Sequence, residues 1–189
     1  YKNHGVVGFD LAGAEENFPA KEHREAFYII QNNNINSTIH AGEAYGPESI
    51  HQAIHYCSAN RIGHGTRLYE DKDLMNYIND HRIALEICLS SNIHTGSVKS
   101  IANHPVKTYI DKNLRVTLNT DNRLMSNTSL TDEYLLAAQT FNLTLDNIYT
   151  IIINGFKSAF LPHNKRREMI NSVISDLETE SNTKESLAI

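Results

Sequence analysis

The chain has 189 residues, of which 40% are hydrophobic and 21% are charged, an ordinary composition for a globular protein with one substantial core. Its net charge of -5 argues against a nucleic acid as partner, and no apolar stretch reaches the roughly 18 residues of a membrane span, so no membrane partner is expected. Because Cys57 and Cys88 match no metal or redox spacing, we expect reduced thiols in a cytoplasmic protein. The length predicts a single domain over residues 1–189.

The first residue is Tyr1 rather than a methionine, and an apolar run starts almost at once, at Val6. A natural amino terminus usually has some lead-in before the first buried segment. We therefore expect further residues upstream of Tyr1, with removal of a short leader as the alternative.

Five short apolar runs, each of about the length of a β-strand, follow one another along the chain. They are Val6–Phe9, Thr38–Ile39 with Ile35 nearby, Arg61–Gly63, Ile83–Cys88 and Arg115–Leu118. Each run ends in small or polar residues, among them Asp10, His40, His64, Ser90 and Asp121. These polar residues lie 24 to 31 positions apart, which is the length of one strand plus one helix with its loops.

Helical signals fill the stretches between and after these runs. Pro47 is a favourable first helical residue, and the apolar residues after it recur at helical spacing. Acidic residues open a second stretch, and Ser129 with Asp132 comes close to a capping box at the start of another. The expected helices cover residues 47–60, 71–80, 129–142, 144–160 and 162–180, and residues 181–189 are expected to fray.

The alternation of strands and helices predicts an α/β fold in which helices cover a parallel sheet. Two architectures fit this pattern. A flavodoxin-like open sheet of five strands would be complete at this length, whereas a (β/α)₈ barrel needs roughly 250 residues and would lack about three strands here. In both folds ligands bind at the carboxyl ends of the strands, so the polar residues that end the runs are expected to converge on one site.

Two histidines and two acids at these run ends have the chemistry of a metal-dependent site. Imidazole and carboxylate are zinc ligands, so His40 and Asp121 are candidate ligands, and His64 could orient or deprotonate a metal-bound water. Glu43 follows His40 by three residues, and a carboxyl group in an apolar strand mouth can act as a proton donor. Simpler interpretations exist for each residue alone: a packed histidine, a tight turn around His64, a helix cap at Asp121. Their common position on one sheet edge favours a shared site.

The other histidines are assigned no catalytic or metal-binding role. His51 and His55 are spaced like a metal-binding pair on a helix, but no acid follows in the zinc-protease pattern, so both are assigned to a helix surface. His94 and His104 are left without a role, and residues 103–109 are interpreted as a loop or the start of a helix.

Five segments stand out as a set, namely GVVGFDLAGAE, TIHAGE, RIGHGTRL, LEICLSSN and VTLNTDN. In order and spacing they resemble the motifs of the adenosine deaminase family, and the resemblance extends to about residue 170. It implies a (β/α)₈ TIM-type barrel of the metal-dependent hydrolase kind, and so it favours the barrel over the open sheet. The chain would then hold the last five βα units, as the C-terminal part of a longer enzyme.

The resemblance also implies a reaction and residue roles. The implied activity is the zinc-dependent hydrolytic deamination of adenosine, and of deoxyadenosine, to inosine and ammonia, with a small purine nucleoside as partner. By motif, His40 and Asp121 would be ligands of one Zn²⁺ ion, and Asp121 would also contact the metal-bound water. Glu43 would protonate N1 of the purine, and His64 would orient that water and help to deprotonate it.

Two more residues are implied to bind the purine, and one family feature is missing. The amide of Gly13 would donate to N3, and Asn122 would contact N7. Many family members carry a second Asp at the position of Asn122, but an amide N–H can donate to N7 without a protonated carboxyl group.

The family supplies two more zinc ligands from a His-x-His motif on its first strand, and no His-x-His occurs in this chain. With two protein ligands alone, zinc should bind weakly.

Two alternatives to adenosine deamination therefore stay open. The substrate could be adenine or an adenine nucleotide, since groups that read the ribose would lie largely outside this chain. The chain could instead be an inactive half-barrel that acts as a binding module, an interpretation that the missing His-x-His supports.

Overall fold

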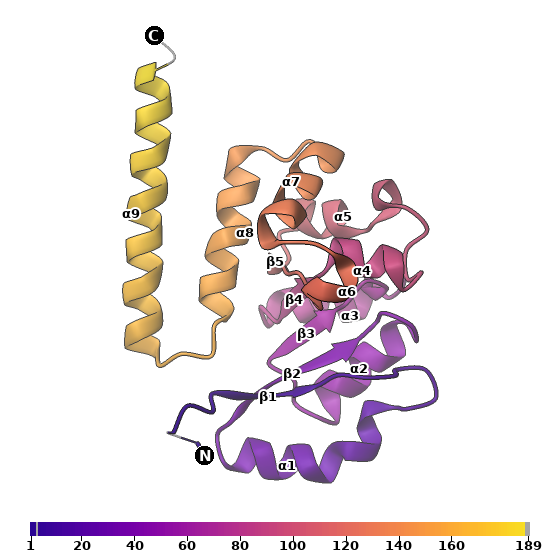
Figure 1. The fold of residues 1–189 in the computed structure, drawn as a ribbon. Helices are drawn as coiled ribbons and strands as arrows, with labels where there is room; N and C mark the ends of the chain where they lie inside the picture. Colours follow the sequence, from indigo (N-terminus) through magenta and orange to yellow (C-terminus); the bar gives the residue numbers. More distant parts are fainter. Residues whose placement is uncertain (3, 188–189) are drawn as a thin grey trace.

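The sheet is parallel throughout and its spatial order follows the chain. The computed structural model describes residues 1–2 and 4–187, with side chains as far as Thr179. Within this part, five parallel strands pair in the order β1-β2-β3-β4-β5 (Figure 1). The strands are β1 Gly8–Leu11, β2 Asn36–Ala41, β3 Arg61–His64, β4 Ala84–Ile87 and β5 Val116–Leu118.

Helices connect the strands, as their alternation predicted. Figure 1 shows α1 beside β1 and β2, α8 beside β5, and α9 alongside α8. Among residues 1–2 and 4–187, no helix has the apolar length that crossing a bilayer requires. The α-helices are α1 Arg24–Asn32, α2 Pro47–His55, α3 Lys72–Asp80, α4 Leu89–His94, α5 Val106–Asp111, α6 Arg123–Ser126, α7 Leu130–Phe141, α8 Leu145–Ser158 and α9 His163–Leu187, and the short 3₁₀ turns are η1 Ala20–His23, η2 Leu68–Glu70 and η3 Ile101–Asn103.

The strand order decides between the two architectures that the sequence left open. A flavodoxin-like sheet contains a point where the strand order reverses, with helices on both faces. In the described sheet each strand pairs with the next one along the chain, for example through the register pair His40 and Gly63. This is the strand order of a (β/α) barrel, which confirms the predicted TIM-type fold class.

The first strand lies later in the sequence than predicted. Its register pairs Gly8–Leu11 with Asn36–Ile39, whereas the apolar run predicted Val6–Phe9. Val6 and Val7 are 46% and 58% exposed, because they precede a strand at the edge of the sheet. Apolar character alone therefore placed this strand too early, and the other four strands lie where they were predicted.

Five helices were predicted and the shortest ones were missed. Helices α2, α3, α7, α8 and α9 lie in the predicted stretches, although α2 ends at His55, before the predicted end at residue 60. Prediction missed α1, α4 and α6, and it located only the start of α5. Helices α4 and α6 have 6 and 4 residues and so carry little local signal, whereas α1 has 9 residues, as many as the predicted α2 and α3. Helix α9 continues to Leu187, so the fraying predicted from residue 181 is wrong up to that point, and Ala188 and Ile189 lie outside the described residues.

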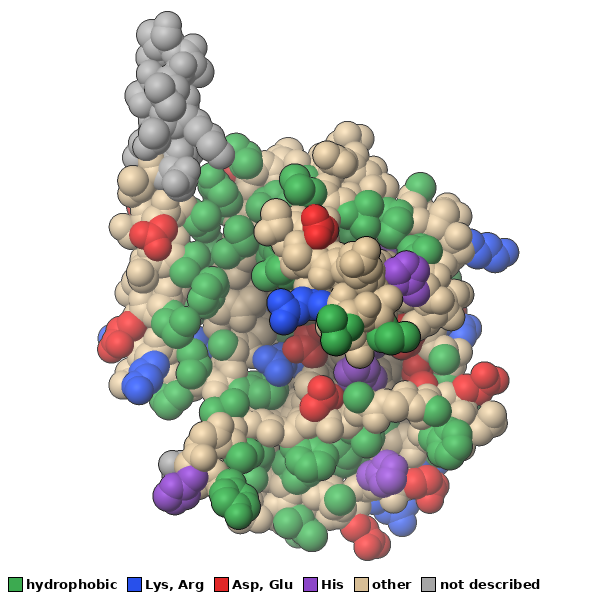
Figure 2. All heavy atoms as spheres, in the orientation of Figure 1, with side chains coloured by type: hydrophobic (Ala, Val, Ile, Leu, Met, Phe, Trp, Pro, Cys, Tyr) green, Lys and Arg blue, Asp and Glu red, His purple; other side chains and the backbone are tan. Residues whose placement is uncertain are grey.

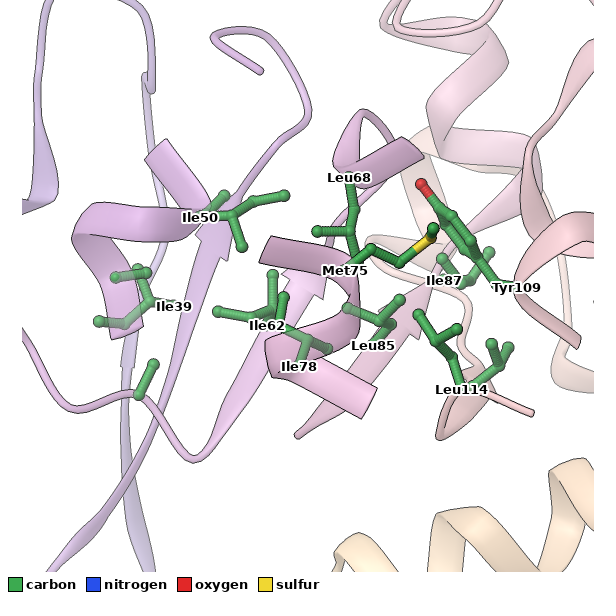
Figure 3. Close-up of a cluster of buried hydrophobic side chains, with 14 of the residues drawn as sticks. Ile39, Ile50, Ile62, Leu68, Met75, Ile78, Leu85, Ile87, Tyr109 and Leu114 are labelled. Atoms are coloured by element: carbon green, nitrogen blue, oxygen red, sulfur yellow. The ribbon is translucent and has the colours of Figure 1, made fainter. Parts of the chain in front are cut away.

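Alternate strand residues face the helices and form the core. Ile39, Ile62 and Leu85 are fully buried there and pack with helix residues such as Ile50 and Ile78 (Figure 3). Complete burial of an aliphatic side chain of this size stabilises a protein by about 1.5–3 kcal/mol. A slip of one residue would turn these side chains away from the helices, so the core fixes the register of each strand.

The opposite face of the sheet is polar. The Thr38 hydroxyl donates a hydrogen bond to Glu86, and Glu86 Oε1 lies 3.0 Å from Nε of Arg61. The Arg61 guanidinium in turn lies 3.6 Å from the centre of the Phe160 ring. Because side chains alternate along a strand, His40 points to the same face as Thr38. The polar side chains of this face therefore lie beneath the carboxyl ends of the strands.

Candidate active site

Three of the predicted site residues meet at the carboxyl ends of β2 and β3. Nε2 of His64 lies 3.2 Å from Nδ1 of His40 and 3.5 Å from Oε2 of Glu43. A Cβ atom on Gly63 would come within 2.8 Å of the His40 ring, so the glycine provides the room in which that ring lies over β3. Figure 2 shows histidine and charged side chains around the hollow in the middle of this face, between β1 and α6.

Left-handed backbone conformations place two of the site residues. His64 has φ 64° and Asp121 has φ 53°, in a region that residues other than glycine seldom adopt. Such a conformation costs about 1–3 kcal/mol and persists where its surroundings hold it. At His64 it ends the regular alternation of β3 and turns the imidazole toward His40 and Glu43. The tight turn that the sequence allowed around His64 agrees with its conformation, and no sequence signal indicated that of Asp121.

Glu43 lies among polar groups rather than in the apolar mouth that the sequence suggested. Its Oε1 accepts hydrogen bonds from Nδ2 of Asn92 at 3.2 Å and from the Thr95 hydroxyl at 2.8 Å. Its other oxygen faces His64. The carboxylate is thus held in one orientation, with Oε2 at the rim of the sheet.

Glu15 holds the loop that carries Glu43, a role that was not predicted from the sequence. Its carboxylate accepts hydrogen bonds from three consecutive backbone N–H groups, those of Gly42 at 2.6 Å, Glu43 at 2.9 Å and Ala44 at 2.7 Å. The Ser49 hydroxyl donates to the same carboxylate. Consecutive N–H groups of this kind form an anion-binding concavity. Glu15 therefore ties the loop after β1 to the loop after β2.

A buried chain of polar groups stands behind His64. Nδ2 of Asn92 lies 3.0 Å from Nδ1 of His64, and Oδ1 of Asn92 lies 3.2 Å from Nε2 of His104. The backbone N–H of Val106 donates to Nδ1 of His104 at 3.1 Å. Burial is the main cause that lowers the pKa of His64, and it lowers the pKa of His104 to about 4. The sequence assigned no role to Asn92 or His104, because the Asn92 partners Glu43 and His64 are distant along the chain.

The two predicted metal ligands have few partners. Nε2 of His40 lies 3.7 Å from Oδ1 of Asp10, and Oδ2 of Asp121 accepts a hydrogen bond of 2.6 Å from the Ser91 hydroxyl. Among the described residues, no group of three or more His, Cys, Asp or Glu side chains is arranged to hold a metal ion. Zinc in proteins is usually bound by three or four side chains. His40 and Asp121 are donors of the right type, but by themselves they do not make a zinc site.

The two predicted purine contacts lie on loops at the same edge. Gly13 lines a cavity of about 480 Å³ that His40 also lines, and its φ of 135° is one that glycine adopts most readily. Asn122 is the N-cap of α6, and its Oδ1 accepts from the backbone N–H groups of Leu124 and Met125. The helix cap that the sequence allowed at Asp121 is therefore made by its neighbour, and Nδ2 of Asn122 is the donor side of the same amide.

Sequence comparison relates the chain to a family of known enzymes. The sequence model of the family "Adenosine deaminase" matches residues 1–176. The adenosine deaminase of Mycobacterium ulcerans is 45% identical in an alignment of 185 positions that covers 92% of this chain and 51% of that protein. Adenosine deaminase 1 of Streptomyces coelicolor is 44% identical over 92% of this chain and 47% of its own length. The chain thus spans about half the length of these curated relatives.

Solved structures show the same fold. Adenine deaminase from Arthrobacter aurescens superposes with a TM-score of 0.88 at 21% identity, over 94% of this chain and 54% of that one. ADAL from Arabidopsis, solved with IMP, has a TM-score of 0.84 at 25% identity, over 94% and 52% of the two chains. An amidohydrolase from Burkhoderia ambifaria, solved with bound Zn, has a TM-score of 0.85 at 15% identity, over 92% and 49%.

Proposed function

Because the chain belongs to the adenosine deaminase family, we propose that the protein catalyses the hydrolytic deamination of a purine, with adenosine or deoxyadenosine as substrate and inosine or deoxyinosine and ammonia as products. The observation that carries the proposal is the group formed by Glu43, His64 and His40 at one sheet edge. It supplies a carboxyl group and an imidazole for proton transfer, next to a metal-ligand side chain.

Glu43 is proposed to protonate N1 of the purine. Protonation of N1 withdraws electrons from C6 and so favours attack on that carbon. The Asn92 and Thr95 bonds hold Oε1, which leaves Oε2 on the open side for the ring. His64 is proposed to lie beside the attacking oxygen, with Nε2 facing the rim.

The purine ring would be held from two loops. The backbone N–H of Gly13 is proposed to donate to N3, and Nδ2 of Asn122 to N7. Two observations support this arrangement. Gly13 lines the cavity next to His40, and the Asn122 oxygen already caps α6, so the N–H₂ group is the half of the amide that can donate to N7.

One zinc ion is proposed, with His40 and Asp121 as two of its ligands. Two further imidazoles would come from outside these 189 residues, in the His-x-His motif that the family resemblance implies. A bound zinc ion supplies a water of lowered pKa. A relative in fold was solved with bound Zn, which supports a metal in this barrel type. The incomplete ligand set also supports the rival proposal of an inactive half-barrel that binds a partner.

Adenine and adenine nucleotides are the second class of substrate. The similarity in fold to an adenine deaminase and to a protein solved with IMP favours testing both. The test is ammonia release from adenosine, deoxyadenosine, adenine and AMP in parallel, by the protein expressed from its complete coding sequence and supplied with zinc. Preferred turnover of the nucleosides supports the proposal. Preferred turnover of adenine or AMP would make that compound the substrate in place of the nucleosides. No turnover together with no bound zinc would support the inactive half-barrel.

A further inference from the structure

We propose that His104 and Asn92 are positioning residues that hold His64 in one neutral tautomer, with its proton on Nε2 at the rim of the site. The tautomer follows from the hydrogen bonds of the folded chain, and only its consequence for catalysis rests on the function proposed above.

The chain of hydrogen bonds starts from a donor whose role is fixed. The backbone N–H of Val106 lies 3.1 Å from Nδ1 of His104, and a backbone amide can only donate. Nδ1 of His104 must therefore be the acceptor and carry no proton. A neutral imidazole with a bare Nδ1 carries its proton on Nε2. The burial that lowers the pKa of His104 to about 4 agrees with a neutral ring near pH 7.

The donor on His104 fixes the orientation of Asn92. Nε2 of His104 lies 3.2 Å from Asn92, so the facing amide atom must be the carbonyl oxygen, as the structure has it. The opposite orientation would set an N–H₂ group against an N–H group. The N–H₂ group of Asn92 therefore points the other way, where it has two acceptors for its two protons: Nδ1 of His64 at 3.0 Å and Oε1 of Glu43 at 3.2 Å.

The donor on Asn92 fixes the tautomer of His64. Nδ1 of His64 accepts a hydrogen bond, so the proton of the neutral ring lies on Nε2, which faces Nδ1 of His40 and Oε2 of Glu43. His64 is 1% exposed, Asn92 0% and His104 3%, so solvent has little access to these hydrogen bonds. Among buried groups, an unpaired donor or acceptor costs about 1–3 kcal/mol, which makes the alternative tautomer unfavourable.

The tautomer narrows the part that His64 takes in the proposed reaction. With a proton on Nε2, the ring donates a hydrogen bond at the rim and so orients the attacking oxygen. It cannot accept a proton at that nitrogen while it is neutral. The carboxylates of Glu43 and Asp121 can then accept one in its place.

The test is nitrogen NMR of the imidazole rings in the metal-free chain near neutral pH, which distinguishes a bare from a protonated ring nitrogen. The His64 signals are assigned by their loss in His64→Gln. We expect a bare Nδ1 and a protonated Nε2 on both His64 and His104. A protonated Nδ1 on His64 in the unsubstituted chain would overturn the proposal, whatever the variants do.

Two pairs of variants sharpen the test. Asn92→Asp replaces the donor by a second acceptor of the same shape, so Nδ1 of His64 should become protonated, whereas Thr95→Val removes another Glu43 partner and should leave the His64 tautomer unchanged. His104→Ala should give a mixture of tautomers, and His104→Gln, which can accept from Val106 and donate to Asn92, should restore the single one. An unchanged Nδ1 signal in folded Asn92→Asp contradicts the proposal.

Failure of this inference and failure of the proposed function give different results. If purines are not deaminated but His64 keeps its proton on Nε2, the function fails and the tautomer stands. If a purine is deaminated and Nδ1 of His64 carries the proton, the function stands and the positioning role of His104 and Asn92 fails.

Discussion

The rim of the sheet has two halves that differ in how completely this chain builds them. The proton-handling half, Glu43 and His64, is held by the buried Asn92 and by Thr95, which both belong to this chain. The half that would hold a metal is open: the His40 side chain is 26% exposed, and its acidic neighbour Asp10 is 54% exposed. Among the described residues no further ligand completes a metal site there. The proton-handling half should therefore keep its geometry without metal, whereas the metal half depends on donors from elsewhere.

The largest effect is expected from the metal half. In the zinc-supplied protein, His40→Ala removes one of the two ligands that this chain offers, so bound zinc and deamination should both be lost. Loss of a group that merely supports a ligand costs roughly 10–100-fold in affinity, and loss of the ligand itself should cost more. Bound zinc is measured by elemental analysis, with His51→Ala on the exposed face of α2 as control. Full retention of zinc would remove His40 from the ligand set.

The next effect separates the two halves. Glu43→Gln removes the proposed proton donor and no metal ligand, so kcat should fall by about 10²–10⁴-fold while bound zinc stays the same. Steady-state deamination and zinc content are measured on the same sample. Glu25→Gln, the same chemical change at an exposed site on α1, should alter neither. Normal turnover in Glu43→Gln would exclude Glu43 from the reaction.

The buried end of the proton-handling half should respond to pH. Burial lowers the pKa of His104 from 6.5 to about 4, so the unfolded chain takes up this proton at a higher pH than the folded chain does. Stability from this group is therefore present above pH 6.5 and is lost as the pH falls toward 4, by roughly 3 kcal/mol in total. Urea unfolding at several pH values measures the loss. In His104→Gln this pH-dependent loss of stability should be absent. An identical pH dependence in both proteins would contradict the role of His104.

A smaller effect concerns the loop that carries Glu43. Glu15→Gln would place an amide N–H₂ group where three backbone N–H groups now find a carboxylate, which should cost about 1–3 kcal/mol. The melting temperature should fall accordingly, and Glu16→Gln, at the exposed neighbouring position, should leave it unchanged. An unaltered melting temperature in Glu15→Gln would show that the carboxylate does not hold the two loops together.

The order of the strands and of most longer helices could be predicted from the amino-acid pattern, and so could the residues at the strand ends. The reason is local: side chains alternate along a strand and recur every third or fourth residue along a helix, so apolar patterns reveal the buried face of each element. Parallel strands bring their carboxyl ends to one edge, and for this reason His40, Glu43 and His64 could be placed together from their spacing alone.

The residues that support that site are revealed by the folded chain and not by the amino-acid pattern. Asn92 meets Glu43 and His64 across 49 and 28 positions of the chain, and Glu15 reaches the loop after β2 across 27 to 29 positions. The left-handed backbone at His64 and Asp121 is likewise held by its surroundings. Such contacts leave no periodic trace in the sequence, because a buried polar group is satisfied by whichever partner the fold brings near, and that partner can lie anywhere along the chain.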